Sequence, residues 1–204
     1  MIIPYKFLTV KDHYKISEQM FAYIHDHTGL LFLNPKFWTK LDIDTVLHHV
    51  PSLKKLLKRN ALTPIQISVI IANPDDLTQP HIHRDTLQPH VRLLWPVKNC
   101  AGSRTKFYHI PNDFMQEIKS DDVRSQATDT YFVPMVEKDW RFLTEFELTG
   151  PIVFDASIAH AVNCVPRPYA KPAHTDWFRI SFTIAFDQSL LISKRVSAWP
   201  DFLN

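Results

Sequence analysis

Residues 178–186 read Phe-Arg-Ile-Ser-Phe-Thr-Ile-Ala-Phe, and this stretch decides the fold. Apolar residues occupy every second position, and the positions between them carry Arg179, Ser181, Thr183 and Ala185. Because successive side chains of a β-strand point to opposite faces, the pattern predicts a strand with one apolar face. The other face carries an arginine among small polar residues, which indicates the lining of a cavity.

Short runs of β-branched and aromatic residues, broken by Pro, Asn and Asp, begin at about Pro64 and predict antiparallel strands. The predicted strands are residues 65–72, 90–97, 105–109, 151–155, 159–165 and 178–186. Residues 99–104 contain Gly102 and are predicted to form a hairpin loop. Residues 111–150 have weak periodicity and predict a short helix with a variable strand or lid, and residues 166–176 predict an extended loop.

The first part of the chain has helical patterns instead. Between residues 11 and 27 apolar residues recur at helical spacing, and Thr28-Gly29 supplies a stop. A second pattern starts near residues 42–44 and resumes after Pro51. We therefore predict one domain over residues 1–204, with a helical support at 1–63 and a β core at 64–187 that has an insertion around 111–150. The expected class is mainly β, a sandwich or jelly roll.

The composition is that of a soluble globular protein. The 204 residues are 45% hydrophobic, and 23 Lys plus Arg against 21 Asp plus Glu give a net charge of only +2. This balance gives no reason to expect nucleic-acid binding. Cys100 and Cys164 are too few for a disulfide framework. No secretory signal and no membrane-spanning run is seen, so a cytoplasmic protein is expected, with no indication of its oligomeric state.

A His-x-Asp triplet, His83-Arg84-Asp85, is the first candidate metal-binding motif. Residues at i and i+2 of an extended segment project to the same side, so His83 and Asp85 could ligate one ion, with His160 as the third ligand. Two imidazoles and one carboxylate hold one face of Fe(II) and leave positions open. His81 has the same spacing from His83, so a site with three histidines is also permitted. The similar triplet that begins at His174 has no histidine after it.

The order of these motifs, followed by Arg179 and Ser181, resembles the Fe(II)- and 2-oxoglutarate-dependent dioxygenase superfamily, whose fold is a double-stranded β-helix, a cupin-like jelly roll. The resemblance covers residues 64–187. Its further matches are Arg92 to Val97 with Gly102, Thr105, Phe107 and Tyr108, then Phe154-Asp155, and then Val162-Asn163. The segments at Pro80-His81, Arg92 and His160 to Asn163 are similar to aspartyl/asparaginyl β-hydroxylase and prolyl hydroxylase-like proteins.

The resemblance implies that His83, Asp85 and His160 hold catalytic Fe(II). It implies that Arg179 and Ser181 bind the distal carboxylate of the cosubstrate 2-oxoglutarate, which suits the planar guanidinium. Further implied contacts to the cosubstrate or an acidic substrate are Arg92, Thr105, Tyr108 and Asn163. With O2 as the third reactant, the expected reaction hydroxylates a small molecule or a peptide side chain and releases succinate and CO2.

Two alternatives stay open at this point. The first is a cupin-type metalloenzyme that uses His81, His83 and His160 without a keto acid, and it shares the same barrel. The second is a non-catalytic jelly-roll binding protein. The alternatives differ in whether Asp85 or His81 contacts a metal, and in whether Arg179 points into the cavity.

Overall fold

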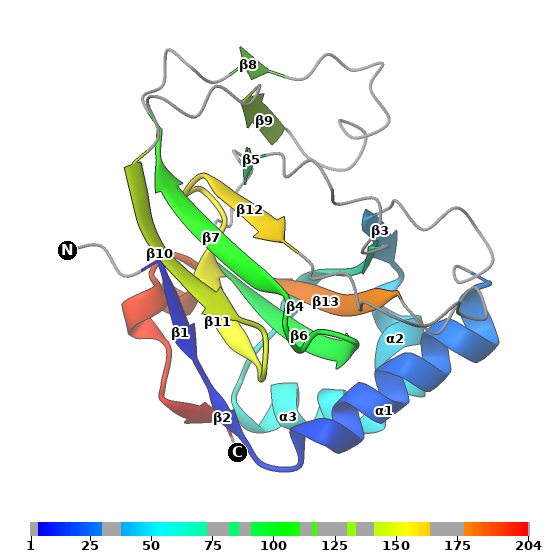
Figure 1. Ribbon diagram of the computed structural model, residues 1–204. Helices are drawn as coiled ribbons and strands as arrows, with labels where there is room; N and C mark the ends of the chain where they lie inside the picture. The colour runs from blue at the N-terminus through cyan, green and yellow to red at the C-terminus, as the bar shows by residue number, and fades with distance from the viewer. Residues whose placement is uncertain are drawn as a thin grey trace.

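The computed structural model describes residues 4–29, 38–72, 82–85, 91–110, 116–117, 130–133, 141–163 and 178–203. Within these residues the chain is mainly β, and its three α-helices lie together along one side of the strands (Figure 1). The predicted class is therefore confirmed in its coarse form. Among the described residues no helix is long and apolar enough to cross a membrane.

Two antiparallel sheets form most of the described β structure. The first has the spatial order β1 (Tyr5–Phe7), β11 (Ile152–Asp155), β6 (Val91–Lys98), β13 (Arg179–Phe186), β4 (Pro64–Ala72) and β3 (Trp38–Leu41). The second has the order β10 (Arg141–Glu147), β7 (Arg104–His109), β12 (His160–Asn163), β5 (Ile82–Asp85), β9 (Thr130–Val133) and β8 (Gln116–Glu117). A parallel pair, β2 (Thr9–Val10) with β14 (Phe202–Leu203), joins segments near the two ends of the chain.

The strands pair in a nested order. Strand β4 pairs with β13, β5 with β12, β6 with β11, and β7 with β10. Strands β4 to β7 are therefore paired with β10 to β13 in reverse order, like the two arms of one long hairpin. Two further pairings, β6 with β13 and β7 with β12, roll this hairpin so that successive strands mostly alternate between the two sheets.

The predicted hairpin at residues 99–104 is wrong. Strands β6 and β7 flank this loop but belong to different sheets. Asn99 and Gly102 both have positive φ values, 53° and 81°, and the chain turns here from the first sheet to the second. Turn residues alone do not distinguish a hairpin from such a crossing, because both need the same local backbone reversal.

Helices cover the outer face of the first sheet. They are α1 (His13–Tyr23), which continues as a π-helical turn at Ile24–Thr28, then α2 (Ile43–His49) and α3 (Pro51–Arg59). The predicted stop is confirmed by Gly29, whose φ of 63° is left-handed. The break at Pro51 is also confirmed, since Pro51 begins α3. Two short 3-10 turns, Leu191–Ser193 and Val196–Ala198, follow β13.

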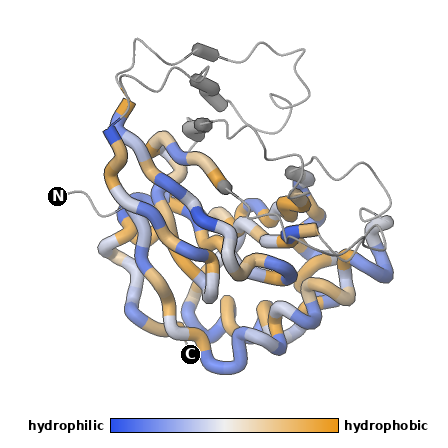
Figure 2. Tube along the Cα trace, in the orientation of Figure 1, coloured by the Kyte–Doolittle hydropathy of each residue, from blue (hydrophilic) through white to orange (hydrophobic). Residues whose placement is uncertain are grey.

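The larger hydrophobic core lies between these helices and the first sheet. It contains the apolar face of β13, whose side chains pack with Trp95 and with residues of all three helices. The indole Nε1–H of Trp95 donates a hydrogen bond to Ser17 Oγ at 3.1 Å, which ties β6 to α1. Figure 2 shows the alternation of hydrophobic and hydrophilic residues along the strands that this packing requires.

Two predictions about organisation need revision, and nothing tests a third. The segment 1–63 is not only a helical support, because β1 and β3 form the two edges of the first sheet. Within the segment 111–150, β10 is a regular member of the second sheet paired with β7, and the described residues there contain no helix. The predicted loop at residues 166–176 lies outside the described residues.

Candidate functional site

The two sheets face each other across an interior of mixed character. Leu94 and Phe154 of the first sheet share a buried apolar cluster with Phe107 and Phe146 of the second. The alternation of β13 places Arg179, Ser181 and Thr183 on this inner face, because Ile180 and Phe182 belong to the helix-covered core on the other face. All three polar residues are buried. The interior thus combines an apolar region with a polar one.

His160 begins β12 and is buried in this interior, with 3% of its surface exposed. Its Nδ1 lies 2.7 Å from the backbone carbonyl oxygen of Ile158. Since a carbonyl can only accept, the ring nitrogen must be the donor, so the neutral form of this imidazole has its proton on Nδ1. The lone pair is then on Nε2, as a metal-ligating histidine with an oriented ring requires. The rings of Phe107 and Phe154 flank His160 at centroid distances of 5.8 and 5.4 Å.

His83 lies directly opposite His160 on the neighbouring antiparallel strand β5. Directly paired residues share a face of the sheet, and residues two apart on one strand do so as well. The backbone register therefore places His83 and Asp85 at positions on the face where His160 is buried. The side chains of His83 and Asp85 are outside the described part of the structure, as is all of His81. Among the side chains that are described, no group of three His, Cys, Asp or Glu is arranged to hold a metal ion.

Arg179 is a buried cation whose partners among the described residues are all neutral. The residue is 2% exposed. Its Nε–H donates a hydrogen bond to Ser103 Oγ at 3.0 Å, and its Nη1 donates one to Ser181 Oγ at 3.3 Å. No carboxylate of the described residues forms an ion pair with it. A buried charge without a counter-charge is unfavourable, and a guanidinium has five N–H donors, of which two are used here. The arrangement is suited to binding an anion.

Arg92 and Thr105 are also buried, but at different distances from Arg179. Thr105 lies two residues after Ser103 on the strand that pairs with β12, opposite Val162. Arg92 lies opposite Ala185 on β13, which is six residues from Arg179 along the strand, or about 20 Å. The structure therefore brings Thr105 close to the polar region and places Arg92 at the far end of the inner face, opposite Phe154.

Tyr108 lies outside this interior, and the backbone register places Asn163 at a position on the other face of its sheet. Tyr108 is three residues from Thr105 on β7, and it packs against a separate small cluster of Ile110, Ala159 and Ala161. Its ring also contacts the exposed Phe142 at a centroid distance of 6.3 Å. Asn163 pairs with Arg104 and is an odd number of residues from His160, so its backbone position is on the face opposite to His160.

Two residues of the polar region escaped the sequence interpretation of the site. Ser103 holds Arg179, and its own hydroxyl donates to the carbonyl oxygen of Cys100 at 2.7 Å. Thr183 is on the same face of β13 as Arg179 and is also buried. Thr183 follows from alternation, since it is two residues after Ser181 on β13, and this parity was the available signal. Ser103 precedes β7, so strand alternation does not predict it.

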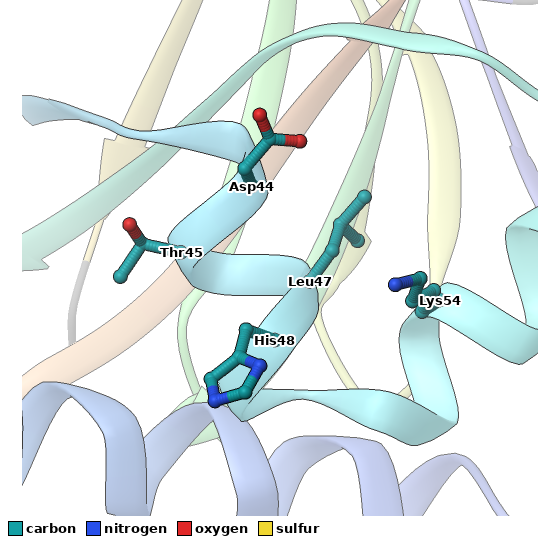
Figure 3. Close-up of a pocket in the computed structure, with 5 residues that line it drawn as sticks. All are labelled: Asp44, Thr45, Leu47, His48 and Lys54. Atoms are coloured by element: carbon teal, nitrogen blue, oxygen red, sulfur yellow. The ribbon is translucent and has the colours of Figure 1, made fainter.

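Two surface cavities lie elsewhere. One cavity, of about 490 Å³, is lined by Asp44, Thr45, Leu47 and His48 of α2 and by Lys54 of α3. Figure 3 shows these five side chains. A second cavity, of about 300 Å³, is lined mainly by apolar residues that follow α3 and β13, including Leu62 and Trp199. Neither cavity is lined by any of the predicted site residues.

Comparisons with known proteins give only distant similarities. No protein-family model matches the sequence, and no curated protein matches it. Among solved structures, an acireductone dioxygenase from Bacillus anthracis with a cadmium ion in its active centre is 12% identical, with a TM-score of 0.31. That alignment covers 90% of this chain and 78% of the other. AviO1 from Streptomyces viridochromogenes Tue57 is 11% identical with a TM-score of 0.37, over 89% of this chain and 88% of the other. At these TM-scores the similarities carry no argument, and the functional interpretation depends on the site itself.

Proposed function

We propose that this protein is an Fe(II)- and 2-oxoglutarate-dependent oxygenase. One observation carries the proposal: the guanidinium of Arg179 is buried inside the fold, is oriented by two serine hydroxyls, and has no carboxylate partner among the described residues. A carboxylate of a small ligand is the natural counter-ion for such a group, because it accepts two parallel charge-assisted hydrogen bonds. This observation supports a keto-acid-dependent enzyme over a cupin-type enzyme that uses no keto acid.

The strand order supports a jelly-roll core of the double-stranded β-helix type. A jelly roll has eight strands in two sheets, and rolling up one long antiparallel hairpin produces it. The nested pairs of β4 to β7 with β10 to β13 have this order. The pairings of β6 with β13 and of β7 with β12 are those that the rolling adds.

The donor set fits a divalent iron. In its neutral form His160 offers the lone pair of Nε2, and the register places the backbone positions of His83 and Asp85 on the same face. In our proposal these three residues hold Fe(II), as in sites with two histidines and one carboxylate. Bound Fe(II) would supply the oxidising chemistry, in which one oxygen atom of O2 enters the substrate as a hydroxyl and the other enters succinate, with loss of CO2.

The remaining residues bind and orient. Arg179 and Ser181 would hold the distal carboxylate of 2-oxoglutarate, and Ser103 would keep the guanidinium in place. Phe107 and Phe154 pack against the ring of His160 and exclude water from that side of the ligand. The prime substrate would be a small molecule or a peptide side chain.

Calorimetry under anaerobic conditions tests the proposal. Titration of 2-oxoglutarate into Fe(II)-loaded protein should show one binding site, and Arg179→Ala should abolish binding while Arg179→Lys restores part of it. The matched control is Arg104→Ala, which removes an exposed arginine that pairs with Glu145 on the outer face. No binding to the wild-type protein, or equal binding to Arg179→Ala, would overturn the assignment.

A further inference from the structure

The second surface cavity lies between the segment that follows α3 and the segment that follows β13. Its volume of about 300 Å³ is at the lower end of the range for small-molecule sites. Leu62 lines it from the first segment, and Leu191, Ile192 and Trp199 line it from the second. Leu62 and Trp199 are buried, whereas Leu191 is 64% exposed. The cavity is therefore an apolar hollow with an exposed leucine at its rim.

Polar groups of the lining residues already have partners within the protein. The indole Nε1–H of Trp199 donates to the carbonyl oxygen of Ile192 at 2.6 Å. The side-chain amide of Asn60 donates to the carbonyl oxygen of Leu56 at 2.8 Å, and the backbone N–H of Leu62 donates to that of Leu57 at 2.9 Å. A polar molecule that entered here would lose hydrogen bonds to water without replacing them. The part of a ligand that fills the cavity should therefore be apolar.

Cationic residues flank the cavity on both sides. Lys58 and Arg59 directly precede its lining residue Asn60, and Lys194 and Arg195 follow Ile192 within three residues. We call these four exposed residues the basic rim. Within the described ranges none of them forms an ion pair. The negative pole at the end of α3 accounts for the first two, but the other two follow a 3-10 turn on the opposite wall.

The acidic residues near the cavity do not balance the basic rim. The carboxylate of Asp201 pairs with Lys6 at 2.8 Å. The carboxylate of Asp187 accepts a hydrogen bond from the backbone N–H of Ser189 at 2.8 Å, and its single charge is opposed by four. Long lysine and arginine side chains carry their charges over neighbouring apolar surface. The opening is therefore suited to a negative head group next to an apolar tail.

We propose that this cavity binds the alkyl chain of a free fatty carboxylate, whose head group lies outside the cavity at the basic rim. A volume of about 300 Å³ holds about ten groups of the size of a water molecule or a methylene, so the chain should have about eight to ten carbons. A concave cavity accepts a single chain, whereas a flat membrane surface cannot enter it. The site lies apart from the residues of the proposed oxygenase centre and adds a second ligand to that function.

Calorimetry with decanoate, below the concentration at which it forms micelles, tests the proposal. The wild-type protein should bind one decanoate, and should bind decyltrimethylammonium, with the same chain and the opposite charge, at least tenfold more weakly because the basic rim repels it. Leu191→Ser should weaken both ligands about tenfold, because an apolar wall of the cavity is lost. The double variant Lys194→Glu/Arg195→Glu should weaken decanoate about tenfold and should not weaken decyltrimethylammonium.

Two matched variants on β10 control for general effects. Leu143→Ser removes another exposed leucine, and Arg141→Glu reverses another exposed arginine, and neither residue lines the cavity. Both controls should bind decanoate as the wild type does. Because Leu191, Lys194 and Arg195 are exposed, their variants should have the Tm of the wild type without ligand.

Four results would overturn the proposal. They are no binding of decanoate to the wild type, equal binding to Leu191→Ser, equal affinity for the two ligands of opposite charge, and binding to phosphatidylglycerol vesicles without binding of monomeric decanoate. The last result would assign the surface to a membrane. Light scattering adds a fifth, because self-association that Leu191→Ser abolishes would assign the cavity to a second copy of the chain.

Discussion

His160 and His83 are direct cross-strand partners on the antiparallel strands β12 and β5. The two residues are far apart in sequence, yet the nested pairing of the strands brings their backbones side by side. Because the register also places Asp85 on the same face, one sheet supplies the positions of all three proposed ligands. The facing sheet supplies Arg179 and Ser181. The proposed iron and the proposed cosubstrate contacts therefore come from opposite walls of one interior.

The proposed ligand set predicts that substitutions of Asp85 and of His81 have different effects on metal affinity. Asp85→Ala should weaken Fe(II) or Mn(II) binding by at least tenfold, because a carboxylate ligand is removed, whereas His81→Ala should leave the affinity nearly unchanged. Calorimetric titration with the metal ion measures the affinity of each variant. The exposed His109 at the end of β7 provides a control variant, His109→Ala. The opposite result, with loss of metal in His81→Ala only, would favour the three-histidine cupin site.

The sequence predicts β13 well because each of its faces has one physical character. Apolar side chains at alternate positions need burial on one side, and the arginine among small polar residues needs a different environment on the other. The same alternation could have separated Thr105 from Tyr108, which are three residues apart and so cannot share a face. The six predicted strands are all present, with ends shifted by a few residues.

Other features depend on tertiary context. The turn at Asn99 to Gly102 has the chemistry of a hairpin, and only the partners of β7 show that the chain changes sheets there. Short edge strands such as β1 and β3 have little pattern of their own, since their pairing with β11 and β4 defines them. The role of Ser103 depends on a contact with Arg179, a residue distant in sequence, which a local pattern does not reveal.

Loss of the Ser103 hydroxyl should weaken the binding of the cosubstrate without slowing the reaction step. Ser103→Ala removes the acceptor of the Arg179 Nε–H and should raise the KM for 2-oxoglutarate about three- to tenfold, while kcat changes little. Steady-state kinetics over a range of 2-oxoglutarate concentrations measure the two constants. The exposed Ser197 offers the matched control Ser197→Ala. An equal fall in kcat and kcat/KM would instead assign Ser103 to the reaction step.

The hydrogen bonds of Ser17 connect α1 to the first sheet and should contribute to the stability of the fold. Its hydroxyl accepts a hydrogen bond from the fully buried indole of Trp95 and donates one to the carbonyl oxygen of Pro96 at 2.7 Å. Ser17→Ala leaves the indole N–H without this acceptor and should lower the free energy of unfolding by about 1–3 kcal/mol. Urea denaturation measures the change. In a Trp95→Phe background the same substitution should cost less, and full additivity of the two changes would show that the contact contributes nothing.

Three imidazoles gather where the π-helical turn after α1 meets the end of α2. The ring of His49 lies 4.1 Å from that of His27 and 5.1 Å from that of His48, measured between centroids, and 5.4 Å from that of Tyr23. Partial burial, and then the positive charges that His27 and His48 can carry, lower the pKa of His49. Burial and the carboxylate of Asp42 raise the pKa of Tyr23. The helix contact therefore favours a neutral His49.

This arrangement predicts a loss of stability in mild acid. A histidine with a lowered pKa in the folded protein binds fewer protons there than in the unfolded chain, so its contribution is present above the unfolded pKa of about 6.5 and is lost as the pH falls below that value. His49→Gln cannot be protonated, so the Tm of this variant should fall less between pH 7.5 and pH 5.0 than the Tm of the wild type. The control His109→Gln removes an exposed histidine outside the cluster and should retain the wild-type pH dependence. If the Tm values of the wild type and His49→Gln depended equally on pH, the neighbours of His49 would not disfavour its protonated form in the folded protein.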